Sequence, residues 1–340
     1  MKAAVYMGRK DVRIKEMEIP ELGDRDVLIK NIYSSICGTD VAVYTHGPHT
    51  GHKVDVGGEF GHETISVVAA AGRKVKDFKP GQRVYPYPYY AKGDTKRAGT
   101  LGGFSEYIHI PNARKGHSLY EVDERISDRA GCLIEPFTVG CRAARQGRPR
   151  PGEKAVVFGC GTIGIAAAIA LKYFGVESVM ICDLSDFRLD IAGKMGFQVC
   201  NTAREDFTAK AEAYFGRAES LNGPVPDVDL FIDAAGAESV LNLFMESGKI
   251  GSRFVIVAVN NVRREIDLLH LTYAQKSIAG SGGYMPEDVR DVMEIMKSGR
   301  WDIESIITHE FGLDDITEAI ETAADPQKAL NVTVRFQNDR

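Results

Sequence analysis

The sequence lacks any pairing pattern among its cysteines. Six cysteines occur in 340 residues, and none of them forms a Cys-x-x-Cys pair. A chain of this length does not need disulfide bonds to fold, so we interpret Cys160, Cys182 and Cys200, which lie in or beside apolar strand patterns, as small buried residues. Unpaired cysteines are typical of a reducing compartment, and we therefore expect a cytoplasmic protein.

Long hydrophobic runs and basic runs are also absent. The longest apolar run, residues 163–171 with glycine counted, is far shorter than a membrane span. The first residues resemble a strand and contain no long apolar region of the signal-peptide type. The net charge is −5, with acidic and basic residues interspersed. We therefore expect no membrane association and no nucleic-acid partner.

The pattern of apolar residues divides the chain into a β-rich part and a part in which strands and helices alternate. Strand composition covers residues 2–6, 12–17, 27–34 and 64–70, and a helical pattern covers residues 127–146. Further strands are expected at 154–159, 177–183, 197–200, 228–234, 253–259 and 278–283, with helices at 162–174, 186–195, 205–216 and 238–247. This alternation predicts a parallel, doubly wound sheet, followed by helices at 286–298 and 314–324 and a strand at 329–336.

A glycine motif at residues 159–164 stands between an apolar strand and a small-residue helix. Gly159 allows a sharp turn, Gly161 allows the backbone to approach a diphosphate, and Gly164 allows the helix to pack closely on the sheet. The amides at the helix start, including those of Thr162 and Ile163, favour an anion. An ordinary glycine-rich turn is the alternative, but the strand and helix on either side favour a dinucleotide site.

Asp183 ends the next strand, about 20 residues further on, where a carboxylate accepts a hydrogen bond from the cofactor ribose. A carboxylate in this place favours NAD and repels the 2′-phosphate of NADP. Arg188 lies nearby and is a second candidate for the cofactor site, although pairing with an acidic residue of its own helix explains it equally well.

Side chains that can bind a metal occur in three short segments of the first half. These segments contribute Cys37, His62, Glu63 and Glu135. Thiolate, imidazole and carboxylate groups are the ligands of catalytic zinc sites with an open position. Taken singly, each residue has a structural explanation, because buried cysteines are common in cores and Glu-Pro suits a helix start.

Several short motifs occur together in one order along the chain. They are Cys37-Gly38-Thr39-Asp40, Gly61-His62-Glu63, Pro80-Gly81-Gln82-Arg83-Val84, Gly102-Gly103-Phe104-Ser105-Glu106-Tyr107, Leu133-Ile134-Glu135-Pro136 and the glycine motif. The set resembles the zinc-dependent medium-chain dehydrogenase/reductase (alcohol dehydrogenase) superfamily, in particular its polyol, threonine and butanediol dehydrogenase branch.

The resemblance implies an α/β fold with two domains. It implies a GroES-like, β-rich catalytic domain over residues 1–148, an NAD-binding Rossmann domain over 149–283, and a return to the catalytic domain over 284–340. It also implies that Cys37 and His62 bind one catalytic zinc, with Glu63 or Glu135, or both in exchange with water, completing the site. By the same resemblance we expect a homodimer or homotetramer.

The resemblance also suggests roles for neighbouring residues. Thr39 matches the hydroxyl that takes the alcohol proton, and Asp40 matches the carboxylate that orients a metal-bound histidine. Many relatives have a relay histidine two or three residues later, where this chain has Ala42 and Val43. We expect His46, Tyr44 or water to end the proton relay instead.

Contacts with the rest of the cofactor are implied at the ends of later strands. The candidate residues are Ala235, Val257, Val259 and Ser281.

One lobe departs from the resemblance. Relatives often carry four cysteines that bind a structural zinc, but residues 85–101 contain none and begin with a tyrosine-rich stretch. We therefore expect no structural zinc, with aromatic packing in its place or, alternatively, an aromatic platform for the substrate.

Together these features predict a zinc-dependent oxidoreductase that transfers hydride between NAD and a secondary alcohol or ketone, with a polyol, sugar or sugar-acid derivative as the expected substrate. L-threonine 3-dehydrogenase and butanediol dehydrogenase are alternatives. A non-catalytic dinucleotide-binding relative and a zinc-free reductase are disfavoured, because all four candidate zinc ligands are present.

Overall fold

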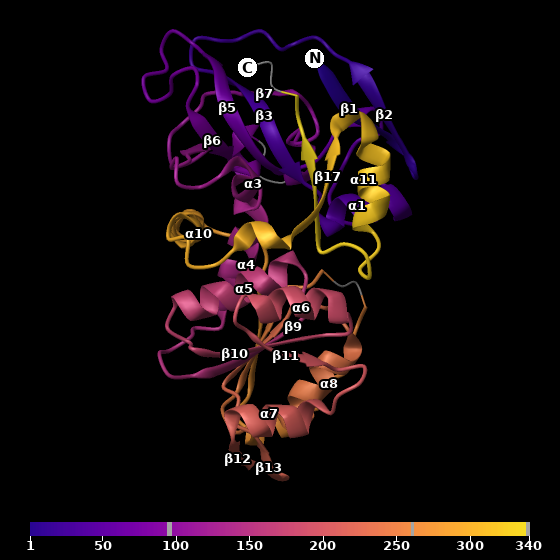
Figure 1. The fold of residues 1–340 in the computed structure, drawn as a ribbon, viewed down its shortest axis with the longest axis vertical. Coiled ribbons are helices and arrows are strands. Elements are labelled where there is room, and N and C mark those ends of the chain that lie inside the picture. Colours follow the sequence, from indigo (N-terminus) through magenta and orange to yellow (C-terminus); the bar gives the residue numbers. More distant parts are fainter. Residues whose placement is uncertain (94–96, 260–261, 338–340) are drawn as a thin grey trace. The chain divides into compact units, whose positions relative to one another are not determined.

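A computed structural model of the chain describes residues 1–93, 97–259 and 262–337. The chain forms two compact units (Figure 1). Unit 1 comprises Met1–Glu135 together with Ile303–Arg340, and unit 2 comprises Pro136–Asp302. Both chain ends therefore belong to unit 1, and the C-terminal segment returns to it.

The unit boundaries differ from those expected at 148 and 283, because two helices belong to unit 2. These are α4 (Ile134–Gln146), all but two residues of which lie in unit 2, and α10 (Pro286–Lys297). Gly140 of α4 packs so closely on helix α5 that an added Cβ would lie 2.5 Å from the Cβ of Ala166. Arg145 of α4 in turn donates to Asp288 of α10 at 2.7 Å. The expected boundary at 148 therefore falls in the loop after α4, inside unit 2.

Unit 1 is built on a seven-stranded sheet and a three-stranded sheet. Its larger sheet has the order β17-β18-β3-β5-β6-β8, with β7 also paired to β3, and its smaller sheet has the order β2-β1-β4. The strands are β1 (Lys2–Gly8), β2 (Asp11–Glu16), β3 (Val27–Ser35), β4 (Gly58–Glu59), β5 (Glu63–Ala71), β6 (Arg83–Pro86), β7 (Tyr107–Ile110), β8 (Leu119–Glu121), β17 (Ile307–Gly312) and β18 (Asn331–Arg335). The helices are α1 (Gly38–His46), α2 (Pro88–Ala91), α3 (Asp128–Gly131) and α11 (Ile316–Ala323), with 3-10 turns η1 (Ala98–Thr100), η2 (Ile303–Ile306) and η3 (Leu313–Asp315).

Helix α1 was not expected from the sequence, which assigned no element between the strands expected at 27–34 and 64–70. Its residues include Val41 and Val43, which prefer strands. The helix forms because Cys37 and Asp40 make a capping box at its start, and because Val43 and Tyr44 are buried in the core shared with α11. Local capping and packing therefore outweigh the β preference of the sequence.

Unit 2 is a six-stranded parallel sheet in the order β11-β10-β9-β14-β15-β16. This is the doubly wound order in which the first strand of the sheet along the chain, β9, lies beside the fourth, β14. The strands are β9 (Lys154–Phe158), β10 (Ser178–Asp183), β11 (Gln198–Asn201), β14 (Leu230–Asp233), β15 (Arg253–Ile256) and β16 (Ser277–Gly280), and β12 (Arg217–Ser220) and β13 (Gly223–Pro226) form a separate hairpin. The helices besides α4 and α10 are α5 (Thr162–Tyr173), α6 (Asp186–Lys194), α7 (Phe207–Phe215), α8 (Glu238–Ser247) and α9 (Leu268–Tyr273). The parallel sheet confirms the expected fold class.

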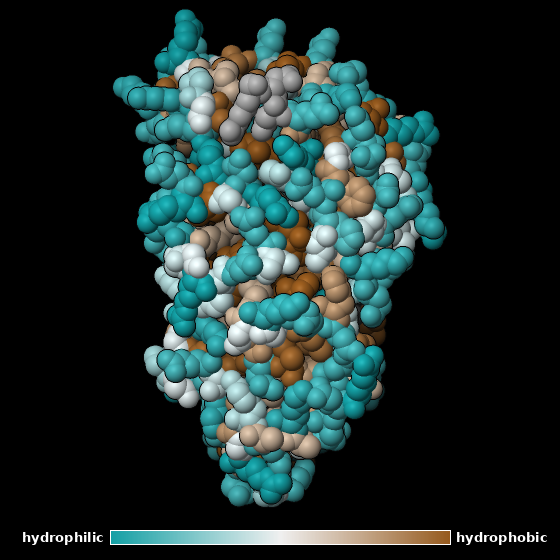
Figure 2. Space-filling model, viewed as in Figure 1, coloured by the Kyte–Doolittle hydropathy of each residue, from teal (hydrophilic) through white to brown (hydrophobic). Residues whose placement is uncertain are grey.

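Each unit has its own hydrophobic core, and the face in Figure 2 is largely hydrophilic, with hydrophobic side chains showing between the polar ones. In unit 2, Phe158, Phe231, Phe244 and Phe254 form a chain of ring contacts along the sheet. Among the residues with described positions, no helix combines the length and the apolar composition of a membrane span.

The tyrosine-rich lobe of unit 1 is packed by its own rings. Tyr87 is 2% exposed, and its ring makes edge contacts with Tyr89, Tyr90 and Tyr120 at centroid distances of 6.0, 5.0 and 6.2 Å. Edge-to-face pairs of this kind add to the free energy gained from burial alone. Ring packing thus supplies contacts within this lobe, as the sequence predicted.

The close approach of helix α5 to the glycine turn at Gly159 gives a test of the fold. A Cβ added at Gly164 would lie 1.8 Å from the carbonyl oxygen of Gly159. We expect Gly164→Ala to lower the free energy of unfolding by about 1–3 kcal/mol, because the helix must move off the strand. Denaturant unfolding followed by circular dichroism measures the change.

Gly193→Ala is the matched control, since a Cβ at Gly193 of α6 meets nothing within 4 Å. It should leave stability unchanged or raise it by up to about 1 kcal/mol through helix propensity. Equal stability of the two variants would contradict the close approach.

Candidate metal centre and dinucleotide site

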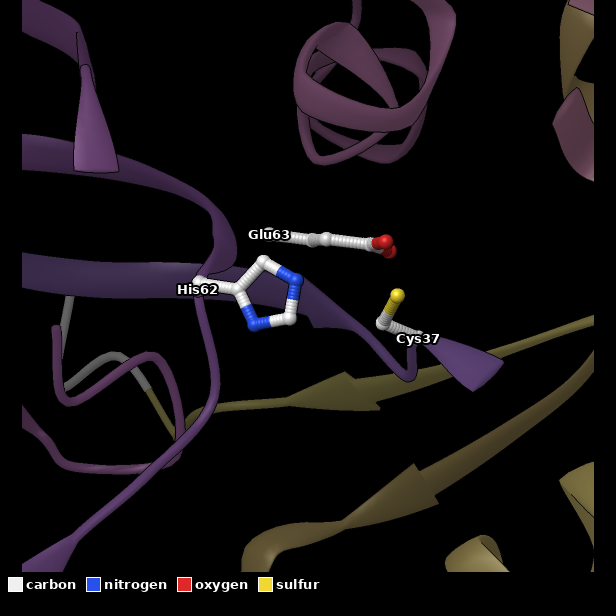
Figure 3. Close-up of side chains that lie close together, drawn as sticks. All are labelled: Cys37, His62 and Glu63. Carbon is white, nitrogen blue, oxygen red and sulfur yellow. The ribbon is translucent and has the colours of Figure 1, made fainter. Parts of the chain in front are cut away.

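Two neighbouring strands of unit 1 bring the metal-binding side chains together. Strands β3 and β5 pair antiparallel, with Ser35 opposite Glu63. Cys37 lies two residues beyond Ser35, and His62 directly precedes β5, so both reach the same end of the strand pair. Ligand atoms of Cys37, His62 and Glu63 lie within 4.8 Å of one another, and Figure 3 shows the three side chains converging.

A glycine turn sets the position of His62. Gly61 has φ +86°, a conformation that favours glycine, and an added Cβ would lie 2.6 Å from the ring of Phe104. Phe104 is fully buried and fills the space beside the turn. The Gly-His-Glu motif therefore needs its glycine to turn the chain into β5.

Asp40 connects the first two ligands. One oxygen of its buried carboxylate accepts from the backbone amide of Cys37 at 3.1 Å, and the other lies 3.6 Å from Nδ1 of His62. The second distance is in ion-pair range but longer than a hydrogen bond. Nδ1 faces Asp40, so the other ring nitrogen points toward the side chains of Cys37 and Glu63 (Figure 3). This geometry agrees with the orienting role expected for Asp40.

The electrostatics of the cluster favour a bound cation. Burial, and then the charge of Glu63, raise the pKa of the Cys37 thiol to about 11. Burial, and then the charge of Glu135, raise the pKa of Glu63 to about 8. Burial opposes charge on His62, but Asp40 and Cys37 outweigh it and hold the pKa of His62 well above its usual range. A cation would lower all three pKa values by favouring the deprotonated forms.

The donor set fits zinc. Thiolate, imidazole and carboxylate ligands leave a fourth position open for water or substrate. Within the described part of the chain, Oε2 of Glu63 is buried without a hydrogen-bond partner. Buried polar atoms seldom lack partners, so this oxygen, beside the thiol of Cys37 and the ring of His62, fits a site that takes a cation. Oγ1 of Thr39 is also buried without a partner among the described residues.

Glu135 lies close enough to influence the site but is not part of the three-ligand cluster. It is 7% exposed at the start of α4, and its charge is a main cause of the raised pKa of Glu63. The described residues contain one cluster of three metal-binding groups within 4.8 Å, and Glu135 is not a member of it.

The expected ends of the proton relay lie elsewhere. His46 is exposed at the last position of α1, roughly 12 Å along the helix from its start, and the structure does not bring it to the cluster. Tyr44 is buried and donates to Glu321 at 2.8 Å. Neither side chain is placed to accept a proton from the hydroxyl of Thr39.

His52 is a site residue that the sequence did not reveal. Its ring meets the ring of His62 edge-on, with centroids 4.6 Å apart. Burial, and then the charge of His62, lower the pKa of His52 to about 4, so its ring is neutral at pH 7. The neighbouring Gly51 packs so tightly on Thr39 that an added Cβ would lie 2.8 Å from the Cβ of Thr39. Nothing in the polar loop around His52 signals this placement.

The glycine motif of unit 2 forms a turn and the start of helix α5. Gly159 has φ +99°, and Gly161 is the N-cap of α5 without a side-chain capping bond. A Cβ at Gly161 would meet only Nη1 of Arg188, at 3.8 Å. The absence of a side chain at Gly161 therefore lets an anion approach the backbone there, as a dinucleotide diphosphate requires.

Asp183 lies at the end of β10 and faces the glycine turn. Its carboxylate accepts from the amides of Cys160 at 2.6 Å, Leu184 at 2.7 Å and Ser185 at 2.9 Å. Two of these bonds reach Oδ1 and one reaches Oδ2, so Oδ2 keeps capacity for one further donor. The three amides fix the carboxylate in place and leave one acceptor position for a ribose hydroxyl.

The other expected cofactor residues lie at or just after the carboxyl ends of β14, β15 and β16. They are Ala235, Val257, Val259 and Ser281. Val259 is 74% exposed, and Oγ of Ser281 is buried without a partner among the described residues. All four positions lie at the edge of the sheet where ligands bind in this fold.

The raised pKa values predict proton release when zinc binds. Cys37, with a pKa of about 11, and Glu63, with a pKa of about 8, are mostly protonated at pH 7 without a cation, and zinc requires both deprotonated. We expect release of more than one proton per zinc at pH 7 and an apparent affinity that rises with pH. Calorimetric titration of zinc-free protein in buffers of different ionisation enthalpy measures both.

Cys37→Ser should lose most zinc affinity, whereas Cys141→Ser is the matched control because that buried thiol lies on α4 of unit 2, beside Arg145. Zinc binding with no proton release at pH 7 would contradict this site.

Two family models match the chain. The model described as "Alcohol dehydrogenase GroES-like domain" matches residues 23–120, and the model described as "Zinc-binding dehydrogenase" matches residues 162–298. Together they cover the cluster in unit 1 and the glycine motif, apart from its first residues, in unit 2.

Full-length relatives have the same organisation. (R,R)-butanediol dehydrogenase of Bacillus subtilis is 30% identical over 94% of both chains, and its crystal structure superposes with a TM-score of 0.85 over 99% of both chains. Sorbitol dehydrogenase of Rattus norvegicus is 29% identical over 98% of this chain and 95% of its own. L-threonine 3-dehydrogenase of Shigella sonnei is 29% identical over 90% of this chain and 91% of its own. The chain therefore belongs to the medium-chain superfamily of zinc-dependent, NAD(P)-linked alcohol dehydrogenases.

Proposed function

We propose that the protein oxidises a secondary alcohol with NAD, or reduces the matching ketone with NADH, and that its substrate is a polyol, a sugar or a sugar-acid derivative. The observation that carries the proposal is the buried cluster of Cys37, His62 and Glu63 in a chain that also has a dinucleotide-type glycine turn. A non-catalytic relative would have no need to keep three desolvated ligands together.

In this proposal Cys37, His62 and Glu63 hold one zinc ion per chain. When bound, zinc supplies Lewis acidity that lowers the pKa of a substrate hydroxyl. The hydroxyl of Thr39, buried two residues from Cys37, accepts the alcohol proton, and Asp40 keeps the His62 ring in position. Because His46 is remote, water takes the proton from Thr39.

Glu135 serves as a second carboxylate in exchange with Glu63. Its charge already acts on Glu63 across the site. A carboxylate is a more mobile ligand than a thiolate, which suits a position where water and substrate must alternate. Glu63 holds the metal at rest, since it is the carboxylate within 4.8 Å of the other two ligands.

The substrate class follows from chemistry that the relatives share. Sorbitol, butanediol and threonine each carry a secondary hydroxyl beside a second polar group. The similarity to the three enzymes differs by only one percentage point of identity, so sequence identity alone does not rank them. Oxidation of threonine or of butanediol is therefore the second candidate function. It differs from oxidation of a polyol, a sugar or a sugar-acid derivative only in the substrate.

We also propose that the enzyme is a homodimer or homotetramer of a reducing, cytoplasmic compartment, without a structural zinc. Unit 2 exposes several large apolar side chains near the edge strand β16, namely Val259, Val262, Leu268, Leu269 and Tyr273. Exposed apolar groups in such a cluster are typical of contact surfaces. All six cysteines are free thiols, which agrees with a reducing compartment.

A panel of alcohols tests the function. Zinc-loaded protein should reduce NAD with at least one polyol, sugar acid, diol or L-threonine, and Cys37→Ser should lower that rate at least roughly a hundredfold through loss of the metal's electrostatic contribution. Absorbance of NADH measures the rate. Cys141→Ser should keep it. Zinc-replete protein that oxidises no member of the panel would defeat the substrate assignment, and equal rates with and without Cys37 would defeat the mechanism.

Asp183 tests the choice of NAD. Asp183→Ser removes the charge that repels a 2′-phosphate, while the hydroxyl keeps one acceptor for the local amides. We expect kcat/KM for NAD to fall by roughly 10- to 100-fold, in line with a loss of one charged hydrogen bond, and the preference over NADP to shrink or invert. Asp186→Ser, at an exposed position at the start of α6, is the control. A wild-type enzyme that prefers NADP would refute the assignment.

A further inference from the structure

A loop after β15 carries an arginine that the expected cofactor set did not include. Arg264 donates from Nη2 to the carbonyl oxygen of Gly236 at 2.7 Å. Gly236 belongs to the turn that follows β14, so this bond fixes one arm of the guanidinium at the carboxyl edge of the sheet. The other terminal nitrogen, Nη1, is buried and has no hydrogen-bond partner within residues 1–93, 97–259 and 262–337.

The turn that holds Arg264 touches the glycine turn directly. A Cβ added at Gly159 would lie 2.9 Å from the carbonyl carbon of Ala234 and 3.0 Å from the amide nitrogen of Ala235. The residue after Ala235 is Gly236, whose carbonyl Arg264 binds. Arg264 is therefore tied to the turn that packs against the glycine motif.

This is also the place in the sheet where the chain order reverses. Strand β9 lies between β10 and β14, so successive crossovers leave it in opposite directions. Ligands of doubly wound sheets bind at this point, outside the carboxyl ends of the strands.

Asp233, at the end of β14, is the acidic residue whose pKa the charge of Arg264 affects, but the two side chains form no hydrogen bond with each other among the described contacts. Its buried carboxylate accepts from the amides of Ala235 at 3.0 Å and Gly236 at 2.7 Å. Burial raises the pKa of Asp233, and the two amides and the charge of Arg264 only partly oppose this shift. The two side chains share no hydrogen bond in the described structure, so the guanidinium keeps a donor for another anion.

We propose that Arg264 binds the cofactor, with Nη1 donating to the diphosphate of the dinucleotide while Nη2 remains on Gly236. A guanidinium has a rigid fork of donors, so one arm can be fixed by a carbonyl while the other meets an anion. The inference rests on the proposed dinucleotide function and adds to it a cationic contact from a loop far along the chain from the glycine motif.

Binding measurements on the zinc-loaded protein test this contact. Affinities for NAD, ADP-ribose and adenosine are measured by calorimetry or ligand-observed NMR for wild type, Arg264→Gln and Arg264→Lys. We expect Arg264→Gln to weaken NAD and ADP-ribose by roughly 10- to 100-fold, as for a lost charged hydrogen bond, and adenosine by less than about twofold. Arg264→Lys should recover part of the loss, because it keeps the charge but not the fork.

Arg263→Gln is the matched control, since Arg263 is the exposed neighbour on the same loop and should leave every affinity unchanged. Equal NAD affinity for wild type and Arg264→Gln would overturn the proposal. An equal loss for adenosine and ADP-ribose would overturn it too, because it would show that Arg264 only supports the turn at Gly236. If wild-type protein binds neither NAD nor ADP-ribose, the proposed function itself fails and this contact falls with it.

Discussion

The metal centre depends on one buried carboxylate. Asp40 is 1% exposed, and it accepts from the amide of Cys37 while facing Nδ1 of His62. The same bond to Cys37 closes the capping box that starts α1, so the group that begins the helix also aligns two metal ligands. A buried charge is costly unless it has partners, and here the amide and the imidazole share that role. Asp40 therefore couples the start of helix α1 to the positions of the Cys37 thiol and the His62 imidazole.

A similar arrangement stabilises the turns of the dinucleotide site. The strands on either side of β9 both end in aspartate, Asp183 on β10 and Asp233 on β14, and each carboxylate accepts from backbone amides of nearby turns. Asp183 reaches across to the glycine turn itself through the amide of Cys160. Glycine permits the turns at this edge, and the two carboxylates hold them in one conformation. A cofactor meets a surface that is already ordered, which reduces the entropy lost on binding.

The sequence predicted the sheet of unit 2 well and unit 1 less completely. Alternating apolar runs place β9, α5, β10 and α8 within about two residues of their observed ends, because period and turn residues are local signals. Helix α1 escaped prediction because its residues favour strands, and the capping by Asp40 and the packing on α11 are visible only in three dimensions. The resemblance to a family supplied Cys37, His62 and Glu63 as candidates, and the pairing of β3 with β5 explains why they meet. His52 and Arg264 gave no signal, since each acts through a contact with a distant residue.

The charge balance of the buried site explains why two glutamates, Glu63 and Glu135, can lie near it. In the proposed site, deprotonated Cys37 and Glu63 would offset the two positive charges of zinc, and His62 would bind as a neutral ring. Glu135 adds a further negative charge nearby, which is why it raises the pKa of Glu63 when no cation is present. Replacing Glu63 by Glu135 as the ligand leaves the net charge of the site unchanged, so exchange between them meets no large electrostatic barrier. Displacing Cys37 in the same way would require a proton for its sulfur, because the thiol has a pKa of about 11 away from a cation. The proposed site would therefore combine two fixed ligands with a third position at which carboxylates alternate.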